Sequence, residues 1–132
     1  MAIDYGQKRV GLAITDPLQI IASPLDTVET KKIFEYLKNY LEKNNVEKII
    51  IGMPYRADGS IPTWAKEIEN FANVLKKTYK HIQIEFYNER YSSKLAQQAL
   101  VQGGFKKKHR QKKENLDKLS ATIILQEYLG II

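Results

Sequence analysis

The order of hydrophobic and polar residues predicts an antiparallel meander at the start of the chain. Short apolar runs over residues 1–5 and 9–14 are separated by Gly6-Gln7-Lys8, which is typical of two strands joined by a tight hairpin. A third run over residues 20–28 is interrupted by Pro24, which predicts a strand that lies at a sheet edge or carries a bulge.

After this meander the pattern alternates between helical and extended segments. Apolar residues recur at three- and four-residue steps over residues 33–41, which predicts an amphipathic helix, and Asn44-Asn45 ends it. An unbroken apolar run then favours a strand that is buried on both faces. The elements expected after the first helix are a strand over residues 46–52, a helix over 62–79, a strand over 81–88, a short helix over 92–102 and a last helix from residue 115.

Two strand-helix-strand crossovers after a meander predict an α/β fold with a mixed five-stranded sheet. Three strands would be antiparallel, the next two parallel, and helices would flank them. With 132 residues, we expect a single domain over residues 1–132. We expect Trp64 to pack in the core rather than to stack on a base, because its position matches the apolar stripe of the second expected helix.

Composition narrows the possible chemistry. The absence of cysteine excludes disulfides, thiolate zinc sites and cysteine nucleophiles. No apolar stretch approaches the roughly 18–20 residues that span a bilayer, and no leader is recognisable, so we expect a cytoplasmic protein with no membrane partner.

The net charge of +6 is concentrated in one short segment. Residues 106–113 read KKKHRQKK and contain no acid, whereas the rest of the chain is balanced in charge. Such a block is suited to polyanions such as a phosphate backbone, although it would equally suit a solvated loop with no partner.

Three acids are expected to meet at one place. Asp4 is in the first strand, Glu89 closes the last strand, and Asp117 lies in the first turn of the terminal helix. The carboxyl ends of parallel strands are where ligands collect, and converging carboxylates favour Mg²⁺ or Mn²⁺. Each acid also has a structural alternative: a turn for Asp4, an ion pair with Arg90 for Glu89, and a helix amino terminus for Asp117.

Four segments decide between these alternatives because together they resemble one family. They are MAIDYGQKRVGLAITD from Met1, IIGMP with DGS from Ile50, ERYSS from Glu89, and DKLSA from Asp117. In this order and spacing they are similar to the bacterial YqgF family of ribonuclease-H-like nucleases, which are associated with Holliday junction resolution and with trimming of the precursor of small-subunit ribosomal RNA. The resemblance spans nearly the whole chain and implies a ribonuclease-H-like fold.

The resemblance also implies roles for individual residues. Asp4, Glu89 and Asp117 would be catalytic and would hold the metal. Residues that would contact nucleic acid are Lys8, Arg9, Arg90, Lys106, Lys107, Lys108, Arg110, Lys112 and Lys113. Tyr91 is a further candidate on chemical grounds, because it lies beside Glu89 and an unpaired base can stack on its aromatic face. The chain departs from the family pattern at Asn88, where an Asp is usual, and only three residues precede Asp4. Glu114, three residues before Asp117, is a candidate auxiliary acid.

These observations lead to one main hypothesis and two alternatives. The main hypothesis is a metal-dependent endonuclease that processes the precursor of 16S ribosomal RNA, as a monomer or weak homodimer. The first alternative is a Holliday junction resolvase, which would act on four-way DNA as a symmetric dimer. The second is a non-catalytic protein that clamps ribosomal RNA with its basic block.

Overall fold

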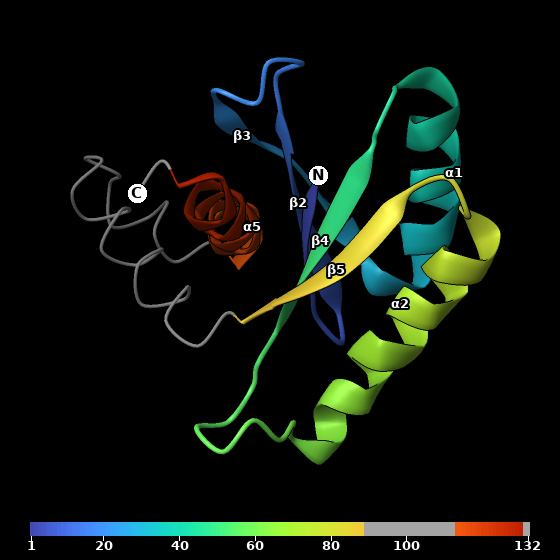
Figure 1. The fold of residues 1–132 in the computed structure, drawn as a ribbon. Helices are drawn as coiled ribbons and strands as arrows, with labels where there is room; N and C mark the ends of the chain where they lie inside the picture. The colour runs from blue at the N-terminus through green and yellow to red at the C-terminus, as the bar shows by residue number, and fades with distance from the viewer. Residues whose placement is uncertain (89–112, 131–132) are drawn as a thin grey trace.

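The computed structural model of the protein describes residues 1–88 and 113–130. Within them one mixed sheet has the strand order β3-β2-β1-β4-β5 (Figure 1). Neighbouring strands are antiparallel between β1, β2 and β3, and parallel between β1, β4 and β5. The strands are β1 (Ala2–Tyr5), β2 (Arg9–Thr15), β3 (Ala22–Glu29), β4 (Lys48–Met53) and β5 (Gln83–Asn88). The expected five-stranded sheet is confirmed.

Helices cover both faces of this sheet. Helices α1 (Ile33–Lys43) and α2 (Lys66–Thr78) lie on one face, and α5 (Lys113–Leu129) lies alone on the other among the described helices (Figure 1). Short 3-10 turns, η1 (Thr30–Lys32) and η2 (Thr63–Ala65), precede α1 and α2. The helix expected over residues 92–102 lies outside the described residues.

The two faces bury separate apolar clusters because side chains alternate along each strand. Ile3, Val10 and Leu12 point toward α1 and α2 and belong to the larger cluster. Ala2 and Ala13 point the other way and pack with α5. Strand β4 contributes to both clusters and is buried from Ile49 to Met53, as expected for a strand inside the sheet.

Pro24 lies where its chemistry allows it. Strand β3 is at the edge of the sheet and has one neighbouring strand, β2. An edge strand tolerates proline, because the N–H that proline lacks is not needed to bond a second strand. Pro24 pairs with Ala13, next to a register shift between Leu12 and Ala13. The sequence predicted a strand that lies at the edge or carries a bulge, and β3 does both.

The prediction that Trp64 packs in the core is wrong. Helix α2 begins at Lys66 and buries Ile68, Phe71 and Leu75, whereas Trp64 lies in the preceding 3-10 turn and is 54% exposed. A 3-10 turn advances about 120° per residue instead of 100°, so the helical stripe cannot be extended back through it.

Within residues 1–88 and 113–130, no helix combines the length and the apolar character needed to cross a lipid bilayer.

Candidate functional site

Asp4 and Asp117 lie on the same face of the sheet. Asp4 is two residues after Ala2, so both side chains point toward α5. Asp117 is one helical turn before Ala121, which packs against the sheet, so it belongs to the stripe of α5 that faces the strands. Two of the three acids that sequence reasoning selected are thus carried by neighbouring elements.

The direction of α5 places both acids toward the same end of β1. Its first half reaches the β1–β2 hairpin, where Asp117 contacts Arg9, and its last turn lies near Lys48 at the start of β4. The two ends of α5 are therefore near opposite ends of the parallel strands. Its amino-terminal part lies near the carboxyl end of β1, where Asp4 is located.

Arg9 connects the hairpin to α5. Its Nε donates a hydrogen bond to Oδ2 of Asp117 at 3.1 Å, and both side chains are partly buried, with 28% and 27% of their surface exposed. Arg9 is also the diagonal neighbour of Asp4, because Asp4 pairs with Gly11 across the ladder. Such neighbours are about 7–8 Å apart, within reach of long side chains. A guanidinium thus stands close to the proposed carboxylates.

The hairpin that carries Arg9 is fixed by backbone contacts. Gly6 N–H donates to the carbonyl of Arg9 at 3.0 Å and closes the turn. Thr30 holds the turn from outside, because its hydroxyl donates to the Gly6 carbonyl at 2.7 Å and its N–H donates to the Lys8 carbonyl at 3.0 Å. A side chain at position 6 would place Cβ only 2.6 Å from the carbonyl oxygen of Arg9, so glycine is required there.

A pocket of about 590 Å³ opens beside this hairpin. It is lined by Gly6, Gln7, Lys8, Arg9, Trp64 and Asp117. Sequence reasoning missed Trp64 as a member of this site. The sequence holds no clear signal for this, because Pro62 can open a 3-10 turn as well as the first turn of a helix.

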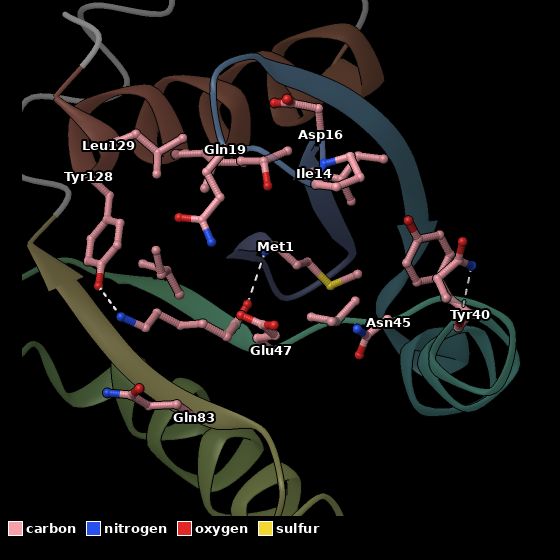
Figure 2. Close-up of a pocket in the computed structure, with 17 residues that line it drawn as sticks. Met1, Ile14, Asp16, Gln19, Tyr40, Asn45, Glu47, Gln83, Tyr128 and Leu129 are labelled. Carbon is pink, nitrogen blue, oxygen red and sulfur yellow. Dashed lines mark hydrogen bonds between the residues drawn. The ribbon is translucent and has the colours of Figure 1, made fainter.

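Polar contacts hold the far end of α5 on the sheet. The Lys48 ammonium donates to the Tyr128 hydroxyl at 2.6 Å, and this hydroxyl donates to Glu85 at 2.9 Å. The first of these bonds is the dashed line that starts at Tyr128 in Figure 2. Tyr87 donates to Glu127 at 2.9 Å, and burial together with this hydrogen bond raises the pKa of Tyr87 to about 12. These contacts fix how α5 lies on the sheet and thereby where Asp117 is held.

A second pocket of about 710 Å³ lies at this far end (Figure 2). Its lining includes Ile14, Gln19, Tyr40, Asn45 and Leu129, but neither Asp4 nor Asp117. It is the larger of the two pockets, yet the chemistry expected from the sequence is at the opposite end of β1.

Glu89, Arg90, Tyr91 and the basic block from Lys106 to Lys112 lie outside the described residues, as do the side chains of Lys113 and Glu114. Within the described part, no three acids or histidines come close enough to hold a metal ion. That part contains two of the three proposed ligands.

The strand order and the helices on both faces define a ribonuclease-H-like α/β protein. The model of one family, described as "RuvX: Holliday junction resolvase", matches residues 1–130. The chain belongs to this family, and the resemblance stated from its motifs is confirmed.

Named relatives agree on the class of enzyme. A protein of Amoebophilus asiaticus is 53% identical over 130 residues, which cover 98% of this chain and 92% of the relative. A protein of Phocaeicola vulgatus is 48% identical over 129 residues, covering 98% of this chain and 93% of the relative. Both carry the name "Putative pre-16S rRNA nuclease". The expectation that this chain is a nuclease is thereby confirmed.

Proposed function

We propose that this protein is a divalent-metal-dependent endonuclease that processes the precursor of 16S ribosomal RNA. The observation that carries the proposal is the placement of Asp4 and Asp117 on one face of the sheet, toward the carboxyl end of β1. The names of the relatives support the RNA substrate. A single domain over residues 1–132 and a cytoplasmic location are parts of the same proposal.

The residues of this region fit a divalent cation. Asp4 and Asp117 offer hard oxygen donors, which Mg²⁺ and Mn²⁺ prefer. Arg9 pairs with Asp117 at 3.1 Å, so a cation bound by this carboxylate would compete with the guanidinium. Glu89 is bonded directly to Asn88, the last residue of β5. Since β5 is two strands from β1, about 10 Å away, side chains from both strands can meet over β4.

Each residue would have a distinct task. Asp4, Glu89 and Asp117 would hold Mg²⁺ or Mn²⁺, which when bound supplies Lewis-acid activation for phosphodiester hydrolysis. Lys8 and Arg9 would hold a phosphate of the substrate beside these acids. Arg90, Tyr91 and the basic block of residues 106–113 would contact the nucleic acid on either side, mainly through phosphates.

One alternative is favoured by a specific finding. The matching family is described as a Holliday junction resolvase, so a four-way DNA junction is the second candidate substrate. A resolvase cuts two strands across a two-fold junction and therefore needs a symmetric dimer. Processing of an RNA precursor does not require a dimer.

The test compares cleavage of two end-labelled substrates in Mn²⁺. One is a 16S ribosomal RNA fragment with its precursor extensions, and the other is a four-way DNA junction. Three proteins are assayed: the unaltered chain, Asp4→Asn, and Glu35→Gln as a matched control. Glu35 is an exposed acid of α1, on the opposite face of the sheet.

We expect the unaltered chain and Glu35→Gln to cut the RNA at a defined position. Asp4→Asn should cut at least about 100-fold more slowly, because even residues that only hydrogen-bond to metal ligands change activity about 10- to 100-fold when they are replaced. Full activity of Asp4→Asn contradicts the catalytic assignment. Cleavage of the junction alone, by a dimer, establishes the resolvase alternative. Binding of RNA without cleavage by any of the three proteins establishes a non-catalytic clamp.

A further inference from the structure

Trp64 is a large apolar side chain that the fold leaves in solvent. It is 54% exposed, although the neighbouring Ala65 is fully buried and anchors the 3-10 turn to the core. The Ala65 N–H donates to the Pro62 carbonyl at 2.9 Å, and the proline ring fixes the backbone where this turn begins. The indole is therefore held outward by an ordered backbone.

The surroundings of the indole are cationic. Trp64 shares the pocket of about 590 Å³ with Lys8, Arg9 and Asp117. The pocket is also lined by Gly6 and Gln7 of the hairpin that Thr30 fixes through Gly6 and Lys8. This volume falls within the range of about 300–1,000 Å³ that is usual for small-ligand sites. The indole of Trp64 and the cationic side chains of Lys8 and Arg9 thus line the same pocket.

We propose that Trp64 is a stacking platform for one unpaired nucleotide of the substrate, next to the cleavage site. This inference rests on the proposed function, because it assumes a nucleic acid at the pocket. The indole face stacks on a base, and Lys8 and Arg9 bind the adjoining phosphate. Bases within a double helix cover one another's faces, so this subsite selects a single-stranded segment.

The position of Trp64 ties this subsite to the proposed catalytic acids. Asp117 lines the same pocket, and its carboxylate is bonded to Arg9. A nucleotide held there has its phosphate at the edge of the acid cluster. Stacking thereby sets which phosphodiester of a partly paired precursor reaches the acids.

Tryptophan fluorescence of this protein reports on Trp64 alone, because the chain contains one tryptophan. The test uses the Asp4→Asn background without divalent metal, so that binding is measured where no cleavage is expected. A fluorescein-labelled single-stranded hexaribonucleotide and a blunt RNA duplex of six base pairs are the probes. Anisotropy gives affinity, and quenching of tryptophan emission, measured with the unlabelled strands, reports stacking.

The hexanucleotide should quench Trp64 emission on binding, whereas the duplex should not. Trp64→Ala should weaken hexanucleotide binding about 5- to 100-fold, as measured for stacked bases, and Trp64→Phe should recover part of the loss. Phe34→Ala is the matched control and should bind like the parent, since Phe34 is an aromatic residue of α1 that is 46% exposed and does not line this pocket.

Three results would overturn the inference. Emission that stays unchanged when anisotropy shows saturation would mean that no base reaches the indole. Equal hexanucleotide affinity in Trp64→Ala would have the same meaning. A change of oligomeric state in Trp64→Ala, seen by light scattering, would assign the indole to a contact between protein chains. None of these results depends on whether Asp4 is catalytic, so this inference and the proposed function fail separately.

Discussion

Replacing Arg9 with glutamine should destabilise the metal-free protein and at the same time strengthen metal binding. The change removes the guanidinium that bonds Oδ2 of Asp117 at 3.1 Å and keeps an uncharged side chain of comparable reach. If Asp117 is a metal ligand, the guanidinium and the metal compete for the same carboxylate. The loss of one should therefore improve the binding of the other.

The magnitude follows from the exposure of the pair. Exposed ion pairs contribute about 0–1 kcal/mol, and hydrogen bonds to charged groups about 1.5–3 kcal/mol. With 28% and 27% of the two side chains exposed, we expect a loss of about 1–2 kcal/mol, or roughly 3–8 °C in melting temperature for a domain of this size. Removing a neighbouring positive charge should tighten Mn²⁺ binding about tenfold, equivalent to about 1.4 kcal/mol.

The assay is thermal denaturation in EDTA and again in a series of Mn²⁺ concentrations. Arg9→Gln should melt lower than the unaltered chain in EDTA and should gain more from Mn²⁺. Lys31→Gln is the matched control, because it breaks a pair with Glu29 whose side chains are 79% and 55% exposed. It should change the melting temperature little and leave the Mn²⁺ response unchanged. If Arg9→Gln behaves like this control in both conditions, the competition at Asp117 is refuted.

Two further predictions concern the elements that hold the site. Gly6→Ala should lower stability by about 1–3 kcal/mol and reduce cleavage, because Cβ would lie 2.6 Å from the Arg9 carbonyl and displace the hairpin. Gly59→Ala, with a φ of +86° and open space around Cβ, should lose about 1 kcal/mol by denaturant titration and keep full cleavage. The pKa of Tyr87 is raised to about 12, so its stabilising contribution is complete below pH 10 and is lost as the pH rises through 12. Ultraviolet titration of Tyr87→Phe should show one late-titrating phenol fewer, and an unchanged titration curve would contradict this assignment.

The sheet could be predicted because each strand carries its own local signal. The alternation on either side of Gly6-Gln7-Lys8 predicted the hairpin, and Pro24 predicted the edge. The unbroken apolar run in β4 predicted a strand buried on both faces. These patterns reflect local backbone chemistry, which does not depend on what the element later contacts.

Contacts across the sheet could not be predicted in the same way. Arg9 and Asp117 were each assigned to the site, but their bond joins residues 108 positions apart and depends on how α5 lies on the sheet. The exposure of Trp64 depends on the residue at which α2 begins. The spacing of apolar residues does not specify that residue. The roles of Glu89 and the basic block stay predictions.

The central claim is that Asp4 and Asp117, together with Glu89, hold one divalent cation. Isothermal titration of Mn²⁺ into the unaltered chain, Asp4→Asn, Asp117→Asn and Glu35→Gln tests it without any substrate. We expect a measurable site in the unaltered chain and in Glu35→Gln, and at least a tenfold loss of affinity in each aspartate variant. Equal Mn²⁺ affinity in all four proteins would contradict the claim.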